Sequence, residues 1–250
     1  ILASKMVVPY IKGVQSNGVA ACVKHFALNN QETNRNSVNV VVDDRALYEI
    51  YLPAFKAAVQ EGDAWAIMGS YNKYKGQQCC HNEYLLNDIL RGEWGFKGVV
   101  ISDWGAVNDT KQAIMNGLDM EFGSWTNGLS EGTSNAYDNY YLAHPYLKLI
   151  KSGEVGTKEL DDKVRRILRL AFLTTMNKNK PFGNIASEEH RAIAKEIGEE
   201  GIVLLKNQKN VLPINIAKTK KIAVIGENAI KMMTVGGGSS SLKVKYETLP

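Results

Sequence analysis

The chain has 250 residues, 44% of them hydrophobic, and its 30 basic and 26 acidic residues give a net charge of +4. This is the composition of a globular protein with one large core or two modest ones. The basic residues are spread along the chain without forming a stripe suited to nucleic acid, and no run of about 18 apolar residues is present to span a membrane. We therefore expect neither nucleic acid nor a membrane as a partner. The first residues, ILASKMVVPY, lack the basic start and the cleavage site of a signal peptide.

The first half of the chain alternates between apolar strands and helical patterns. Strands are predicted at residues 18–26, 64–72, 98–105 and 117–122, and helices at 43–61, 82–92 and 106–116. Each predicted strand ends in polar residues. Alternating strands and helices are typical of a parallel β/α layout, and in barrels of this kind the catalytic groups lie at the carboxyl ends of the strands. The sequence therefore predicts an α/β enzyme.

The strands are too few for a complete barrel. A (β/α)8 barrel has eight strands in about 250 residues, whereas helical patterns at 142–152 and 157–176 follow the fourth strand of this chain. We expect residues 1–173 to be the second half of a TIM-type barrel, completed by other parts of the same polypeptide or by a partner chain. Residues 174–187 are predicted to be a linker.

The last part of the chain begins a second unit. Ser187, followed by two glutamates and an apolar run, is typical of a helix start. Strands are predicted at 201–206 and 221–226, before a Gly/Ser run at 236–241. We expect residues 188–250 to be the incomplete start of an α/β sandwich domain.

The strand at 98–105 delivers a carboxylate and an indole, those of Asp103 and Trp104, where it stops being apolar. A carboxylate on a short loop at a strand end is held rigidly, which suits catalysis. Asp is also common as the cap of a helix, and a helix is predicted from Ala106. The spacing alone leaves both interpretations open.

Lys24 and His25 are adjacent polar residues at the end of another apolar strand. A buried cation there is costly unless it meets partners such as hydroxyl groups or a carboxylate. A histidine that is simply hydrogen-bonded within the core is the alternative for His25. A desolvated lysine at this position also suits Schiff-base chemistry, but nothing else in the sequence supports an aldolase.

Five segments stand out in chain order: KHFALNNQETNR (24–35), MGSYN (68–72), GVVISDWGAV (98–107), NGLDMEFG (116–123) and HRAIAKEIGEEGIVLLKNQKNVLPI (190–214). The first four resemble the barrel of family 3 glycoside hydrolases, in its β-glucosidase branch. The fifth resembles the entry to the second domain of that family. The resemblance covers nearly the whole chain and is weakest at residues 123–141.

The resemblance implies a retaining, exo-acting β-glucosidase that releases terminal non-reducing β-D-glucosyl residues through a covalent glycosyl-aspartate intermediate. Retention requires a nucleophilic carboxylate and a second carboxyl group as acid, about 5 to 5.5 Å apart. By resemblance Asp103 is the nucleophile, and Lys24 and His25 bind the hydroxyls of the glycone. The acid of the family is a glutamate of the second domain, which is expected beyond residue 250.

Three further roles are implied in the same way. Tyr71 is expected to hydrogen-bond near the nucleophile, Met68 to line the glycone pocket, and Trp104 to offer an apolar face to a sugar ring. From the residues alone, a Met in a strand fills the core and a Tyr at a strand end packs half-buried. The resemblance also implies cis peptide bonds at Lys24–His25 and at Phe26–Ala27.

The remaining charged residues of these segments are expected to be structural. Asp119 and Glu121 end the fourth strand without a catalytic role, and Glu32 pairs with Arg35 to brace the floor of the site. The loop-like segment 124–141 is predicted at the rim of the pocket. Its aromatic residues either stack on a sugar or pack on the surface: Trp125, Tyr137, Tyr140 and Tyr141.

Neither a cofactor nor a metal is predicted. The sequence after Gly226 has no G-x-G-x-x-G pattern, and the run at 236–241 is not followed by Lys-Ser/Thr. The histidines show no metal-ligand spacing with each other or with the cysteines. Cys22, Cys79 and Cys80 are interpreted as buried thiols in preference to a disulfide or metal ligands.

Two alternatives to a β-glucosidase stay open on the sequence. One is a β-xylosidase of the same family, and the other is a carbohydrate-binding segment without catalysis, which the absence of an acid in these residues permits. The segment KHFALNNQETNR favours the β-glucosidase.

Overall fold

The computed structural model describes residues 1–123 and 140–229. Internal contacts divide the chain into two compact units, residues 1–183 and residues 184–250. The first unit has a mixed α/β architecture, and the second contains one long helix followed by extended chain.

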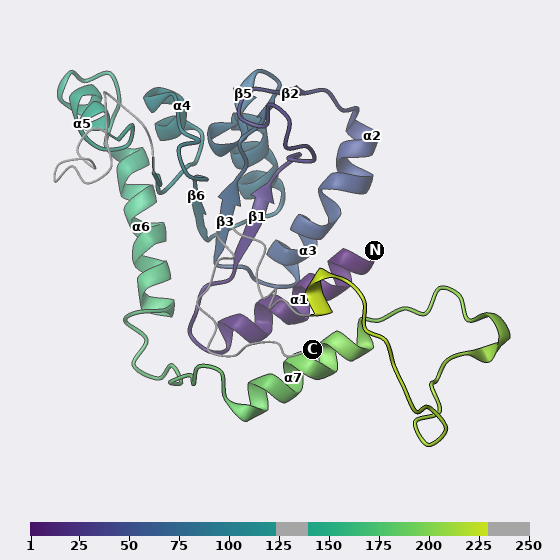
Figure 1. The fold of residues 1–250 in the computed structure, drawn as a ribbon. Helices are drawn as coiled ribbons and strands as arrows, with labels where there is room; N and C mark the ends of the chain where they lie inside the picture. The colour runs from purple at the N-terminus through teal and green to yellow at the C-terminus, as the bar shows by residue number, and fades with distance from the viewer. Residues whose placement is uncertain (124–139, 230–250) are drawn as a thin grey trace. The chain divides into compact units, whose positions relative to one another are not determined.

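A three-stranded parallel sheet forms the centre of the first unit (Figure 1). Its strands lie in chain order, β1 (Cys22–Phe26), β3 (Ala66–Gly69) and β6 (Val99–Ile101). Within the register, Ala66 pairs with Cys22 on one side and with Val99 on the other. The prediction of parallel strands with helices between them is confirmed for these three segments.

The fourth predicted strand, at 117–122, is reduced to a single bridge between Met120 and Ile101. The backbone amides of Asp119 and Met120 both donate to the carbonyl of Val100. The Met120 carbonyl accepts from the amide of Ser102 at 2.9 Å, and the amide of Phe122 donates to the Ser102 hydroxyl at 2.9 Å. Beyond the bridge, side-chain and backbone contacts thus replace a regular ladder.

Helices connect the strands and cover the sheet. They are α1 (Leu2–Gln15), α2 (Asp44–Ala46), η1 (Leu47–Tyr51), α3 (Pro53–Gln60), η3 (Tyr84–Glu93), α4 (Thr110–Met115), α5 (His144–Lys151) and α6 (Lys158–Leu173). The helix predicted at 43–61 forms three successive pieces, the last of which begins at Pro53 because proline fits the first turn. The helix predicted from Ala106 begins later, at Thr110.

The core lies between the sheet and these helices. Phe26 packs edge-to-face on Phe55 and Trp94, with ring centroids 5.1 and 5.9 Å apart. The helix η3 contributes one apolar face, which consists of Leu85, Leu86, Ile89 and Leu90, each at most 1% exposed. Burial of each of these side chains stabilises the fold by about 1.5 to 3 kcal/mol.

A second, smaller sheet lies beside the site and was not predicted. It consists of β2 (Asn39–Val40), β4 (Lys73–Tyr74) and β5 (Gln77–Gln78). The two-residue turn Lys75-Gly76 joins β4 to β5, and both residues have positive φ, 51° and 82°. This is the backbone that a tight hairpin requires, and Gly76 adopts it without steric cost.

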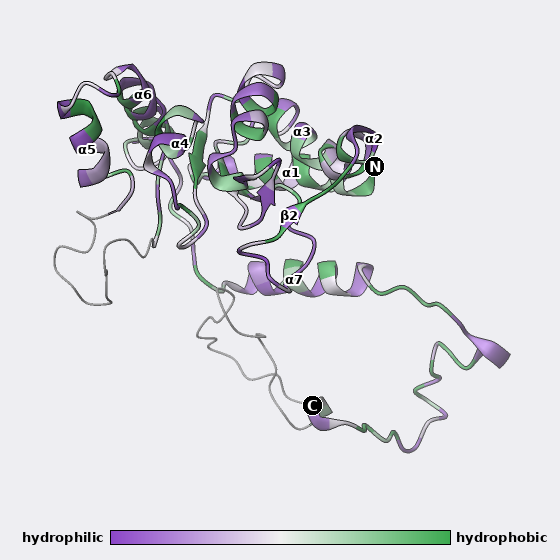
Figure 2. Ribbon diagram, turned by 90° about the horizontal axis from the view of Figure 1, so that it is seen from above, coloured by the Kyte–Doolittle hydropathy of each residue, from purple (hydrophilic) through white to green (hydrophobic). Residues whose placement is uncertain are grey.

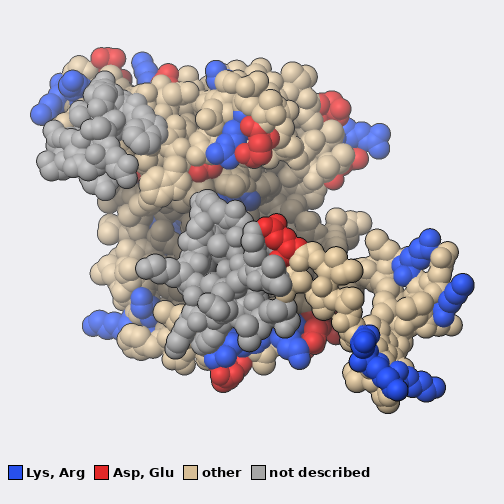
Figure 3. Space-filling model, in the orientation of Figure 1, with Lys and Arg blue, Asp and Glu red and all other residues tan. Residues whose placement is uncertain are grey.

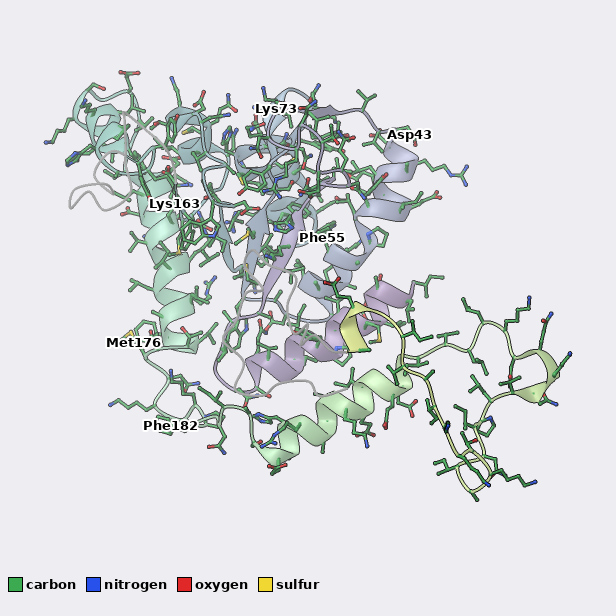
Figure 4. The ribbon with its side chains drawn as sticks, in the orientation of Figure 1. Asp43, Phe55, Lys73, Lys163, Met176 and Phe182 are labelled. Atoms are coloured by element: carbon green, nitrogen blue, oxygen red, sulfur yellow. The ribbon has the colours of Figure 1, made fainter. Side chains whose placement is uncertain are left out.

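Buried charges attach α6 to the sheet. The Asp119 carboxylate is fully buried and accepts hydrogen bonds at 2.7 Å from Arg91 and from Arg166 of α6. Lys163, on the side of α6 that faces the sheet in Figure 4, donates to the carbonyls of Ala113, Ile114 and Leu118. Burial lowers the pKa of Lys163 to about 8.

The second unit begins with α7 (Glu188–Glu200), which Ser187 caps by accepting the amide of His190 at 3.2 Å. The prediction of a helix start at Ser187 is confirmed. Beyond α7 the described chain is extended and contains only the short turns η5 (Gln208–Asn210) and η6 (Glu227–Ala229), with several apolar residues along it (Figure 2).

The predicted strands at 201–206 and 221–226 are wrong for this structure. Both segments are irregular, and Ile202, Val203, Ile222 and Val224 are 68 to 78% exposed. A strand forms only where a neighbour accepts its backbone hydrogen bonds, and the described residues of this unit offer none.

On the face of the first unit seen in Figure 3, basic and acidic side chains are interspersed. None of the helices within residues 1–123 and 140–229 is long and apolar enough to cross a membrane.

The buried carboxylate of Asp119 leads to a stability prediction. Asp119→Ala leaves the guanidinium groups of Arg91 and Arg166 without their shared partner, so we expect the free energy of unfolding to fall by about 3 to 5 kcal/mol. Chemical denaturation of the intact protein measures this. Asp162→Ala on the exposed face of α6 is the matched control and is expected to leave the midpoint unchanged, because exposed pairs contribute little.

Candidate active site

The carboxyl ends of β1, β3 and β6 bring together the polar residues that follow these strands. Parallel strands in register place these ends at one edge of the sheet, so Tyr71 and Asp103, each two residues beyond its strand, lie near His25. The pairing of β1 with β3 has an extra residue between Val23 and Phe26. Such a bulge redirects side chains. The peptide bonds Lys24–His25 and Phe26–Ala27 are both cis, as expected.

Asp103 is held by its own backbone and by its neighbours. Its carboxylate is buried, with Oδ1 accepting the amide of Trp104 at 2.8 Å and Oδ2 lying 3.4 Å from Nε2 of His25. The helix-cap interpretation of Asp103 is wrong, because α4 begins at Thr110 and is capped by Asp109. One carboxylate oxygen is thus fixed by the backbone, and the other faces the imidazole.

The surroundings of His25 favour its neutral form. Partial burial lowers its pKa, the nearby Asp103 carboxylate opposes this effect, and the positive charges of Lys24 and Arg35 add to it. A neutral imidazole beside a carboxylate donates one hydrogen bond and accepts another. His25 therefore has hydrogen-bonding capacity for a ligand as well as for Asp103.

Tyr71 connects the end of β3 to the loop of Asp103. Its hydroxyl donates to the carbonyl of Trp104 at 2.8 Å. Burial, followed by the charge of Asp103, raises the pKa of Tyr71 to about 12, so the phenol remains a donor. The guanidinium of Arg35 lies 4.6 Å from the centre of the Tyr71 ring, and Arg35 also forms the expected ion pair with Glu32, at 2.8 Å.

Trp104 presents its indole to solvent. The side chain is 62% exposed although it is large and apolar, and one side of it packs edge-to-face on Phe122. Gly105 turns the chain with φ of 70° and its amide donates to the Phe122 carbonyl at 2.9 Å. At Gly123 a Cβ would collide with the indole. The ring is therefore supported from one side and open on the other.

Lys24 and Met68 are less closely tied to the other candidates. Lys24 is exposed, whereas a buried cation was expected, and among the described residues no ion pair of it is found. Cys22, on the same face of β1, is also exposed, so its interpretation as a buried thiol is wrong. The reason is that β1 is the edge strand and the described residues leave this face uncovered. Met68 is half-buried and pairs with Ile101.

Four of the six predicted site residues, His25, Tyr71, Asp103 and Trp104, therefore meet at one point. The sequence did not indicate the contact of Arg35 with the Tyr71 ring. The position of Arg35 in the loop that follows Lys24 and His25 does not specify a contact.

The other carboxylates near the strand ends are structural. Asp119 holds two arginines and the amide of Val100, and Glu121 accepts the amides of Tyr141 and Leu142 at 3.1 and 2.7 Å. Tyr141 is partly buried and packs against the main core, whereas its packing alternative expected it on the surface. Of the other rim aromatics, Trp125 and Tyr137 lie outside the described residues.

Other features of the described residues lie away from this site. Within residues 1–123 and 140–229 no group of three or more His, Cys, Asp or Glu side chains is arranged to hold a metal. A cavity of about 680 Å³ is lined by Trp65, Trp94, Phe96, Arg166 and Arg169, among others. It lies at the amino ends of β3 and β6, opposite to Asp103.

A carboxylate fixed at the carboxyl edge of a parallel sheet, with an open indole beside it, lies where α/β barrel enzymes carry their catalytic groups. Comparison with known families is consistent with this class. Residues 1–170 match the N-terminal domain of glycosyl hydrolase family 3, and residues 202–250 match the C-terminal domain of the same family. The chain belongs to glycoside hydrolase family 3.

Relatives at the level of sequence and of structure agree. A β-glucosidase of Bacteroides ovatus is 56% identical over 98% of this chain. The structure of β-glucosidase 3B from Thermotoga neapolitana in complex with glucose has a TM-score of 0.85 at 37% identity and covers 97% of this chain. That of a β-glucosidase from Kluyveromyces marxianus with glucose has a TM-score of 0.81 at 36% identity over 96%. The chain spans 33%, 33% and 28% of these proteins, respectively.

The electrostatics of His25 lead to a testable prediction. The pKa of His25 is expected below its ordinary value of 6.5, and lower still in Asp103→Asn, because that change removes the negative charge that favours the protonated ring. An NMR titration of labelled histidines in the intact protein measures both values. The surface variant Glu49→Gln is the control and is expected to leave the titration unchanged. A higher pKa in Asp103→Asn would contradict the electrostatic description of the site.

Proposed function

We propose that the intact protein is a retaining, exo-acting β-glucosidase that hydrolyses terminal non-reducing β-D-glucosyl residues. The observation that carries the proposal is the geometry of Asp103, a buried carboxylate with one oxygen held by the Trp104 amide and the other facing His25. The membership of family 3, with relatives named β-glucosidases, supports this assignment over a β-xylosidase or a binding segment without catalysis.

In the proposed first step, Asp103 attacks the anomeric carbon of the bound glucoside. The bond from that carbon to the leaving oxygen breaks, and a carboxylic acid protonates this oxygen as the aglycone departs. In the second step water, deprotonated by the same group, attacks the anomeric carbon and releases glucose and the Asp103 carboxylate. The acid/base is proposed to be a glutamate outside residues 1–250.

The other site residues are proposed to bind and orient the glycone. Lys24 and His25 bind hydroxyls, His25 with the ring nitrogen that a neutral imidazole has available. Tyr71 holds the loop of Asp103 through the Trp104 carbonyl, and Met68 lines the glycone pocket. Trp104 stacks its open face on a sugar ring. No cofactor has a role in these steps.

The architecture proposed for the intact protein follows from the same family. Residues 1–173 are proposed to be the second half of a (β/α)8 barrel, 174–187 a linker and 188–250 the start of an α/β sandwich. The uncovered face of β1 and the exposed apolar residues beyond α7 support the need for further parts of the polypeptide or a partner chain.

The nucleophile is tested first. Asp103→Asn in the intact enzyme is expected to lower turnover of an aryl β-glucoside on the order of 10⁴-fold, because the covalent step is lost. A 2-fluoro glucoside is expected to label Asp103, which peptide mass spectrometry identifies. Labelling of Glu121, or full turnover by Asp103→Asn, contradicts the proposal. A parallel assay on an aryl β-xyloside separates the two specificities.

The exposed indole gives a second test. Trp104→Ala is expected to raise KM for the aryl glucoside about 5- to 30-fold, since aromatic contacts with a ligand contribute about 1 to 2 kcal/mol. The melting temperature is expected to change little, because the side chain is 62% exposed. Trp104→Phe retains an aromatic face, so its KM is expected to lie between those of the wild type and of Trp104→Ala. An unchanged KM in Trp104→Ala would exclude stacking.

A further inference from the structure

The turn η2 (Cys79–His81) lies beneath the candidate active site, and the mechanism above makes no use of it. Its three side chains are at most 1% exposed. Burial raises the pKa of both cysteines, that of Cys79 to about 11, so both remain thiols that donate and accept hydrogen bonds. Three adjacent buried polar side chains in so short a turn need partners, because an unpaired buried group is costly.

The partners are the ends of the three strands. Cys79 donates to the carbonyl of Ala27, just after β1, at 3.5 Å and accepts from the Asn72 amide at 3.3 Å. Cys80 donates to the carbonyl of Ser70, just after β3, at 3.4 Å. The backbone amide of Asp103, beyond β6, donates to Sγ of Cys80 at 3.5 Å.

His81 extends the same pattern to the loop after Asp103. Its ring nitrogens lie 3.1 Å from Oε1 of Gln112 and 3.0 Å from Oδ1 of Asn108, and its carbonyl accepts from Asn116 at 3.0 Å. The turn therefore contacts both Asp103 and the loop that leads into α4.

The packing around Cys80 leaves no room for adjustment. A Cβ at Gly69 would lie 2.7 Å from Cα and 2.8 Å from Sγ of Cys80, closer than atoms approach in folded proteins. Cys80 therefore packs directly on Gly69, the last residue of β3, and its sulfur accepts the backbone amide of Asp103. The Cys80 side chain therefore lies between the end of β3 and the backbone of Asp103.

We infer that Cys80 is a positioning residue for Asp103. Its thiol bridges the Ser70 carbonyl and the Asp103 amide. It thereby fixes the position of Asp103, along the strand direction, relative to β3 and to Tyr71. Cys79 is not assigned this function, since its side-chain partners are Ala27, Asn72 and Ser70 and do not include Asp103. The inference rests on the proposed function of Asp103 as the nucleophile, and it assigns to a buried thiol a share in the rate of the covalent step.

The test compares two substitutions in the same turn, each of which removes one buried sulfur atom. In the full-length enzyme, Cys80→Ala is expected to lower kcat per active site about 10- to 100-fold with KM changed less than about 3-fold, because a small displacement of a reacting group costs this much. Cys79→Ala, equally buried, is expected to keep kcat within about 3-fold. Active sites are counted by titration with a 2-fluoro glucoside, so loss of folded protein does not affect the value.

The outcomes are distinct. A wild-type kcat per site in Cys80→Ala, or equal losses in both variants, overturns the inference. If Cys80→Ala is not obtained folded, Cys80→Ser decides: its shorter side chain is expected not to reach both partners, so a lowered kcat supports the inference and a wild-type kcat overturns it. Asp103→Asn is assayed in parallel. Full turnover by that variant overturns the proposed function, whereas its loss beside an active Cys80→Ala overturns the inference alone.

Discussion

The site depends on where three neighbouring strands end relative to one another along the strand direction. The predicted functional residues lie in or just after three different strands, so their side chains meet only while β1, β3 and β6 keep their register. Backbone hydrogen bonds fix this register within the sheet, but the strands are short and end before Tyr71 and Asp103. Beyond those ends side chains take over, with Ser70 and Asn72 both donating to the Ala27 carbonyl and Tyr71 donating to that of Trp104.

The same division explains the placement of charge. The carboxylate of Asp119 is enclosed by two arginines and serves the attachment of α6 to the sheet. The carboxylate of Asp103 instead contacts a backbone amide and the His25 imidazole, and within residues 1–123 and 140–229 it forms no ion pair with an arginine. A carboxylate that is neutralised by two cations is a poor nucleophile. The partners of the two carboxylates therefore differ: Asp119 is neutralised by two arginines, whereas Asp103 is not.

Much of the first unit could be predicted from the sequence. Apolar runs ending in polar residues located the three parallel strands, because apolar residues indicate a buried strand and polar residues indicate where it ends. The helix α1 was missed although Val7, Ile11 and Val14 have helical spacing and pack together, and the β4–β5 hairpin was missed although Lys75-Gly76 is a tight-turn pair. The signals were present in both cases but short.

Other features do not follow from the sequence of these residues. The start of α4 depends on Asp109 rather than on Asp103, because the backbone geometry of the loop decides which aspartate caps the helix. The strands expected at 201–206 and 221–226 have the correct residues, but strand formation requires a neighbouring strand. The contact of Arg35 with Tyr71, and the partners of Cys79 and Cys80, join segments far apart in the chain, and spacing contains no information about them.

The close approach of Gly69 to Cys80 has a consequence for how such a chain diverges. A side chain at position 69 would collide with Cys80, so Gly69 can be replaced only if the backbone or side chain of residue 80 shifts as well. Trp104, by contrast, contributes little to the core and can be exchanged freely as far as folding is concerned. Single substitutions can therefore alter the exposed indole beside Asp103, whereas replacement of Gly69 requires an accompanying change at Cys80.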